Sequence, residues 1–134
     1  MTRHETRIAA FQLMFAKELN SSENEELIAA VEETEEPQIN QPAKEIFAEA
    51  MNHKEEFDEI IGQASKTRAV SRISKAVLSI LRLALYEIKY DESIPESVAI
   101  NEAVLIAKEY CDEADASFIN GVLGTYVRSS DKND

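Results

Sequence analysis

The sequence predicts an all-α protein, a compact bundle of about six to seven helices. Two observations lead to this prediction. The chain has three Gly and three Pro in 134 residues, so long segments run without the residues that most often end helices. Apolar side chains recur three or four positions apart over most of these segments, and 44% of all residues are hydrophobic. This content is enough for the core of one domain.

The first helix is expected over residues 3–19. Its apolar stripe falls at positions i, i+3, i+7 and i+11, namely Ile8, Phe11, Phe15 and Leu19. Arg3 and Arg7 lie four positions apart and therefore share a face. A shorter second helix is expected over residues 23–33, with Ser22 as its cap. The acidic, proline-flanked residues 32–42 that follow read as an exposed loop.

A third helical region is expected over residues 43–64, with a bend or break at the polar residues 52–54. His53 lies in this gap and is expected to face solvent. No other His, Cys or carboxylate cluster stands at metal-ligand spacing with it, so no metal site is predicted.

The most strongly apolar helix is expected over residues 70–90. Its apolar residues cover most of the helix surface, which is typical of the central helix of a bundle. A separate short helical turn over residues 65–72 is an alternative start. Arg82 lies within the apolar sequence and can either extend outward or pair with a buried carboxylate.

Two further helices complete the bundle, one from Pro95 to about residue 110 and one ending near Arg128. Ser117 or Asp115 is the expected cap of the last helix, and residues 129–134 are expected to form a disordered tail. Gly121 lies inside this helix at a cost of about 1 kcal/mol relative to Ala. Either a close helix approach or space for a ligand would explain it.

The formal net charge of −12 is unevenly distributed. Residues 1–17 carry three basic side chains against one acidic, and residues 64–90 carry six against one. Polyanion binding depends on such local patches, although charge alone favours ordinary solvated faces. No segment approaches a membrane span or a signal peptide, and the lone Cys111 cannot form an internal disulfide, so a cytosolic protein is expected.

No catalytic motif is present in the sequence, and no enzyme is predicted. Tyr86 and Glu87 are a candidate exposed contact pair, the alternative being that Tyr86 packs and Glu87 faces water. Asn101 and Glu102 are expected to cap or bridge neighbouring helices. Phe118 can stack an unpaired base, although an aromatic residue in such a helix more often belongs to the core.

Four segments together resemble the NusB family of transcription antitermination factors. They are RIAAFQLMFAKEL near the amino terminus, ILRLALYEI, IPESVAINEAVLIAK and FINGVLG. The resemblance covers nearly the whole chain and is strongest in its carboxyl-terminal half. It implies a seven-helix, all-α fold, a single NusB-like RNA-binding domain over residues 1–134, and RNA binding without catalysis or a cofactor.

The resemblance also implies partners and site residues. NusB proteins bind the single-stranded boxA element of nascent ribosomal RNA transcripts together with NusE, which is also a small-subunit ribosomal protein. The complex joins RNA polymerase. The RNA contacts carried over to this sequence are Arg3, His4, Arg7, Gln12, Phe15 and Phe118. The implied NusE contacts are Glu87 and the adjacent Tyr86.

The sequence departs from the family pattern at three places, and two of these departures remove positive charge. Its amino-terminal basic cluster is reduced to Arg3 and Arg7, Ser117 stands where many members have Lys, and Gly124 where many have Asp. Each lost phosphate contact reduces the slope of log K against log salt concentration by about one unit. We therefore expect this protein to depend more on NusE for RNA binding.

Two other functions fit the sequence less well. One is a helical protein-interaction module without RNA binding of its own. The other is the RNA-binding domain of an RNA methyltransferase. This function is less favoured because the sequence up to Asp134 contains no methyltransferase domain. A homodimer is compatible with the sequence, which does not define the oligomeric state.

Overall fold

The computed structural model describes residues 1–20, 23–33 and 39–132, and these residues form helices without any strand. The predicted all-α fold is confirmed. The helices, with one short 3-10 turn labelled η1, are α1 (Arg3–Leu19), α2 (Asn24–Glu32), α3 (Gln41–Asn52), α4 (Lys54–Ala64), η1 (Val70–Arg72), α5 (Lys75–Tyr90), α6 (Glu96–Tyr110) and α7 (Glu113–Lys132).

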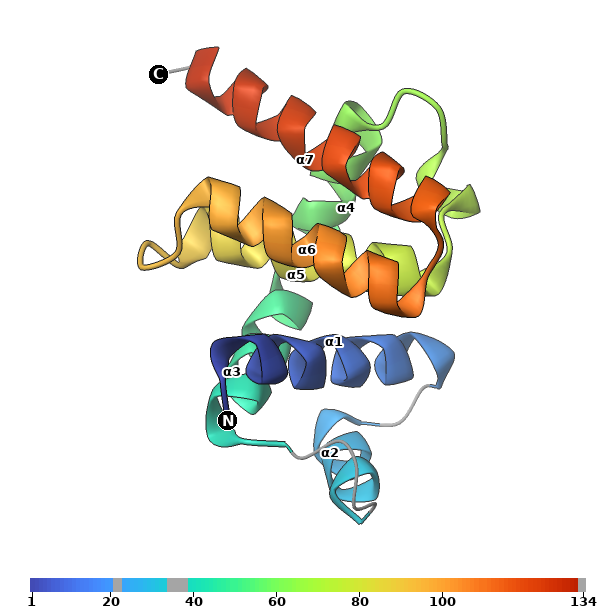
Figure 1. Cartoon of the computed structure of the whole chain (residues 1–134). Coiled ribbons are helices and arrows are strands. Elements are labelled where there is room, and N and C mark those ends of the chain that lie inside the picture. Colours follow the sequence, from blue (N-terminus) through green and yellow to red (C-terminus); the bar gives the residue numbers. More distant parts are fainter. Residues whose placement is uncertain (21–22, 34–38, 133–134) are drawn as a thin grey trace.

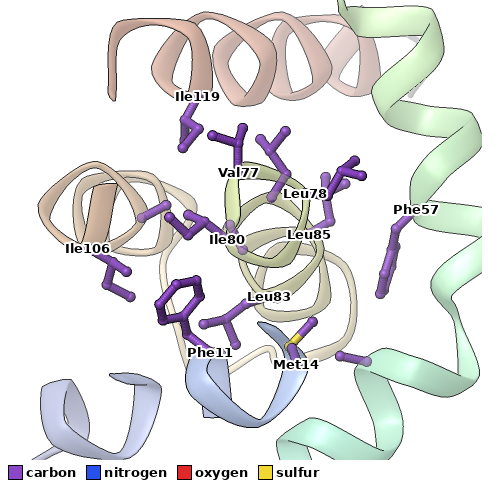
Figure 2. Packing of buried hydrophobic residues seen from close by; sticks show 14 of the residues in the cluster. Phe11, Met14, Phe57, Val77, Leu78, Ile80, Leu83, Leu85, Ile106 and Ile119 are labelled. Carbon is purple, nitrogen blue, oxygen red and sulfur yellow. The ribbon is translucent and has the colours of Figure 1, made fainter. Parts of the chain in front are cut away.

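Helix α5 is the centre of the bundle, as its apolar surface predicts. It contacts α1, α3, α4, α6 and α7. Figure 2 shows its side chains meeting Phe11 and Met14 of α1, Phe57 of α4, Ile106 of α6 and Ile119 of α7. All five of these partners are at most 1% exposed, and burying each contributes about 1.5–3 kcal/mol. The surface helices are therefore positioned by α5.

The helix boundaries in the first half agree closely with the sequence pattern. Helix α1 begins after Thr2, whose hydroxyl accepts the Glu5 backbone N–H while the Glu5 carboxylate accepts that of Thr2. Helix α2 follows without a side-chain cap hydrogen bond, and Ser22, its predicted cap, lies outside the described residues.

The third helical region breaks at His53, inside the polar gap where a bend or break was expected. His53, which was expected to face solvent, is partly exposed, with 34% of its side chain accessible. Its ring stacks on Tyr90 of α5 with centroids 4.3 Å apart and also lies 5.9 Å from the Phe57 ring. His53 ends α3 and begins α4, and the two helices follow each other directly in the chain (Figure 1).

A separate turn before the central helix is also present. Residues 70–72 form η1, and α5 begins only after Ser74, whose hydroxyl accepts the Val77 backbone N–H at 3.2 Å. The residues between α4 and α5 thus form an exposed connection rather than the first turns of α5. The α4–α5 connection, defined as residues 65–75 so that it includes the first residue of α5, carries four basic side chains, Lys66, Arg68, Arg72 and Lys75.

Helix α7 differs from its prediction at both ends. Its cap is Asp112, not Ser117 or Asp115, because the Asp112 carboxylate accepts the Asp115 backbone N–H at 2.8 Å. The helix continues to Lys132 instead of ending near Arg128. Residues 129–132 contain no Gly or Pro to end the helix, and residues 133–134 lie outside the described residues.

Arg82 pairs with carboxylates inside the bundle and does not extend outward, which is the second of the two arrangements that the sequence allowed. It is 3% exposed, and its guanidinium donates to both Asp58 carboxylate oxygens at 2.8 and 2.9 Å and also binds Glu18. Burial opposes the charged form, but the hydrogen bonds and charge of Asp58 and Glu18 raise the pKa of Arg82 above its ordinary value. This cluster ties α5 to α4 and α1.

Candidate nucleic-acid interface

Arg7 and Glu87, expected to bind different partners, bind each other. Arg7 is 5% exposed and Glu87 is 3% exposed, and the Arg7 Nε donates to Glu87 Oε2 at 2.8 Å. Burial raises the pKa of the Glu87 carboxyl, against the opposing effect of the Arg7 guanidinium. The expectation that Glu87 is exposed is therefore wrong, and so is the alternative in which it faces water. The pair fastens the start of α1 to the end of α5.

Glu102 of α6 lies between His4 and Arg7 and bridges α6 to α1. Its Oε2 is 2.7 Å from His4 Nδ1 and 3.9 Å from Arg7 Nη1. The bridging role expected of Glu102 is confirmed, whereas Asn101 is exposed. His4 remains partly accessible, with 39% of its side chain exposed.

Gln12 and Phe15 lie further along α1, beside the end of α6. Gln12 Nε2 donates to the Tyr110 hydroxyl at 3.3 Å, while its amide oxygen is buried without a hydrogen-bond partner in the described chain. The Phe11 ring contacts two other rings. It stacks on Phe15 with centroids 5.9 Å apart, and it is tilted against Tyr110 with centroids 5.2 Å apart. An unpaired buried acceptor is costly, and this oxygen lies below the surface of α1.

Arg3 and Tyr86 are placed differently from the residues above. Arg3 is exposed at the start of α1 and forms no ion pair with the residues that the structure describes. It lines a cleft of about 330 Å³ whose wall includes Glu87. Tyr86 is half-buried and packs against the core, and burial raises the pKa of its hydroxyl. Of the two arginines predicted to contact RNA from α1, Arg3 is thus the accessible one.

Phe118 lies in the second turn of α7, half-buried against the core. The Arg68 guanidinium covers its ring at 4.2 Å from the centroid. Asp115, one turn earlier in α7, holds Arg68 through a 3.0 Å bond to Nη1. The basic connection between α4 and α5 therefore reaches the corner at which base stacking was predicted.

The six predicted RNA contacts lie along one path rather than at one point. Helices α1 and α6 run in the same direction (Figure 1). His4 at the start of α1 binds Glu102 in the middle of α6, and Gln12 further along α1 binds Tyr110 at the end of α6. His4 and Gln12 are eight residues apart on α1, or about 12 Å. The chain then passes from α6 into α7, where Phe118 lies. Such an elongated track suits an extended strand better than a compact ligand.

The residues that sequence reasoning missed are the cations of the α4–α5 connection. Lys66, Arg72 and Lys75 are exposed and form no ion pair with described residues. Of the six basic side chains in residues 64–90, the other three are bound to acids: Arg68 to Asp115, Arg82 to Glu18 and Asp58, and Lys89 to Glu56. The local excess of positive charge was the signal that could have identified these residues.

Other kinds of site find no support in the described part of the chain. It holds no group of three or more His, Cys, Asp or Glu side chains placed to bind a metal ion. None of its helices combines the length and apolar character needed to cross a membrane. Cys111 is half-buried, and burial raises the pKa of its thiol, which disfavours the reactive thiolate.

Known proteins resemble this chain over nearly its whole length. The model of the NusB family matches residues 4–128. The chain is 40% identical over 132 residues to the transcription antitermination protein NusB of Clostridium botulinum (strain Alaska E43 / Type E3), covering 96% of this chain and 99% of the relative. It is 34% identical over 130 residues to the protein of the same name from Lacticaseibacillus casei (strain BL23), covering 96% of each.

Solved structures share the same fold. A crystal structure of the antitermination factors NusB and NusE in complex with dsRNA matches with a TM-score of 0.82 and 26% identity, over 95% of this chain and 96% of the other. The structure of T. maritima NusB matches with a TM-score of 0.82 and 27% identity, over 96% and 92% of the two chains.

Proposed function

The chain belongs to the NusB family, and we propose that it is a transcription antitermination factor that binds RNA together with NusE. The observation that carries this proposal is the whole-chain match to a factor solved with NusE and RNA. A factor of this family is not an enzyme. The proposal places the whole protein, as one domain, in the cytoplasm, where it joins the antitermination complex of RNA polymerase.

The RNA path that we propose follows the α1–α6 track. Arg3 and His4 bind the backbone at the start of α1, Gln12 and Phe15 contact bases further along, and Phe118 stacks a base at the start of α7. Phosphate contacts position a strand and base contacts select its sequence. The RNA is the single-stranded boxA element of ribosomal RNA transcripts, although the RNA in the solved complex is double-stranded.

Glu87 has a different role in this proposal from the one that the resemblance implies. Because it is buried and bound by Arg7, it supports the NusE surface by fixing the end of α5, next to Tyr86 and Asp91. NusE then contacts the surface around this end of α5.

The decisive experiment is a titration of labelled boxA RNA and of a scrambled strand of the same composition, with and without NusE. We expect boxA to bind more tightly than the scrambled strand when NusE is present, and weakly when the protein is alone. Equal binding of the two strands in the presence of NusE would contradict the proposal.

A second candidate, a helical interaction module without RNA binding, is favoured by one observation. Two of the basic side chains predicted on α1 are engaged internally, Arg7 by Glu87 and His4 by Glu102. Charge reversal of the exposed Arg3 separates the two functions. We expect Arg3→Glu to weaken boxA binding while leaving NusE binding intact. A module without RNA activity would show the same RNA signal before and after the change.

A further inference from the structure

The cleft that Arg3 lines carries charges of both signs. It measures about 330 Å³ and lies where the start of α1, the start of α3, the end of α5 and the turn into α6 meet. Each of these elements contributes a different kind of side chain. The lining includes Arg3 and Arg7 from α1, Glu87 and the cap residue Asp91 from the end of α5, and Pro42 and Ile46 from α3.

Two of the lining side chains are almost completely buried and still have unused polar atoms. Arg7 and Glu87 are 5% and 3% exposed, and they share one hydrogen bond, from Nε to Oε2. Both Nη groups of Arg7 and the Oε1 atom of Glu87 form no hydrogen bond to the residues that the structure describes. Among those residues, the only fully inaccessible side-chain atom without a partner belongs to Gln12. The free atoms of Arg7 and Glu87 are therefore reached through the cleft.

The two other charges of the cleft, Arg3 and Asp91, are available as well. Neither forms an ion pair within the described part of the chain. The Asp91 Oδ1 atom accepts the backbone N–H and the hydroxyl of Ser93, which leaves Oδ2 open. Burial, together with the charges of Asp91 and Glu102, raises the pKa of Glu87. A positive group placed beside Glu87 and Asp91 would therefore be stabilised.

We propose that this cleft binds a free apolar α-amino acid, such as leucine. The carboxylate of the ligand binds Arg3 and the free Nη groups of Arg7. Its ammonium group binds Glu87 Oε1 and Asp91, and its side chain packs on the apolar wall from α3. The proposal goes beyond the proposed function, because it assigns a small-molecule ligand to this protein.

The balance of charge in the cleft favours an amino acid over a simple ion. Two arginines and two acids line it, so a simple cation or anion would meet like charges as well as opposite ones. A zwitterion places each of its charges against the opposite one. The volume of about 330 Å³ is near the lower end of the roughly 300–1,000 Å³ typical of small-molecule pockets, which also combine apolar walls with a few polar groups.

The first test is calorimetric titration of the whole chain, without RNA or NusE, with leucine and two analogues that each lack one charge. The analogue 3-methylbutylamine lacks the carboxylate, and 4-methylpentanoate lacks the ammonium group. We expect leucine to bind about tenfold more tightly than either, because each analogue loses charged hydrogen bonds. An analogue that binds as tightly as leucine would overturn the inference. So would the absence of saturable binding by leucine, valine and phenylalanine.

Two substitutions then test where each charge of the ligand binds. Asp91→Asn removes a negative charge but keeps an oxygen for Ser93. Its matched control is Glu92→Gln, at the next residue, which is exposed and outside the cleft lining. We expect Asp91→Asn to weaken leucine binding several-fold without weakening that of 4-methylpentanoate. Arg3→Gln should weaken leucine binding without weakening that of 3-methylbutylamine.

The control Glu92→Gln is expected to bind leucine as the unmodified protein does. Equal leucine affinities in Asp91→Asn, Arg3→Gln and this control would overturn the inference, since the ligand would then bind elsewhere. Neither RNA nor NusE takes part in these titrations, so their outcome is independent of the proposed function.

Discussion

The start of α1 and the α4–α5 connection carry similar numbers of basic residues but use them differently. At the start of α1, Arg7 is buried against Glu87, and His4 is bound by Glu102. In the α4–α5 connection, Lys66, Arg72 and Lys75 are exposed without an acidic partner among the described residues. The first region uses its charges mainly to join helices, and the second leaves them available for an anion. Counting basic residues therefore does not locate the positive surface.

The largest difference between the regions should be seen on removing Arg7. Arg7→Ala leaves the Glu87 carboxylate buried without its partner, and breaking such a pair typically costs 3–5 kcal/mol. We expect the free energy of unfolding in urea to fall by about 3 kcal/mol or more, whereas Lys66→Ala changes it by less than about 0.5 kcal/mol. A loss below about 1 kcal/mol for Arg7→Ala would show that the pair does not hold α1 in place.

Replacement of Phe118 tests the second region by affinity. Stacking on an aromatic side chain contributes about 1–3 kcal/mol per base, which is roughly fivefold to a hundredfold in Kd. We expect Phe118→Ala to weaken boxA binding by this amount without changing the salt slope, since no phosphate contact is lost. Phe118→Leu is the control that keeps apolar volume. If Leu binds RNA as well as Phe, stacking is not the interaction.

Gly121→Ala also tests the region of Phe118, with a smaller expected effect. The added methyl group meets no atom within 4 Å, and the exposed helix should gain about 1 kcal/mol from the change. We expect a more stable protein with weaker RNA binding, because the methyl group enters the cleft of about 210 Å³ that Gly121 and Phe118 line between α4 and α7. Gly124→Ala is the matched variant in the same helix but outside the cleft lining. Weaker binding in both variants would point away from the cleft.

The smallest expected effect is a change in pH dependence at the first region. The pKa of Glu87 is raised above its ordinary 4.5, so the folded state binds this proton more tightly than the unfolded state. The contribution of Glu87 to stability is therefore fully present below about pH 4.5 and is lost as the pH rises through the folded pKa.

Urea unfolding of the unmodified protein and of Glu87→Gln at several pH values measures this effect. We expect the stability of the unmodified protein relative to Glu87→Gln to decrease from acid to neutral pH. An increase over the same range would mean that the charge of Arg7 outweighs the burial of Glu87.

Local patterns in the sequence predicted most of the fold, because helices depend on nearby residues. The extent of α1 and the break at His53 were both found in this way, although Leu19, which was placed in the apolar stripe of α1, is exposed. The cap of α7 was misjudged because Asp112, Asp115 and Ser117 are all good caps, and only the backbone path selects among them.

The candidate site was predicted less well than the fold because its interactions join distant residues. Nothing in the neighbourhood of Arg7 indicates that Glu87, 80 positions later, neutralises it. The same holds for Arg68 and Phe118, whose side chains meet only after α4 and α7 pack together. A family resemblance gives a residue's position in the fold, but it does not tell whether the side chain is free.

The 80-residue separation of Arg7 and Glu87 also has a consequence during protein synthesis. Ribosomes add about 5–20 residues per second, so Arg7 waits on the order of 4–16 seconds before Glu87 has been made. Until then α1 has no central helix to cover its apolar stripe. His4 waits longer, for Glu102, and the Phe118 corner is made last. A nascent copy of this protein therefore gains its complete RNA-binding track only when nearly the whole chain has left the ribosome.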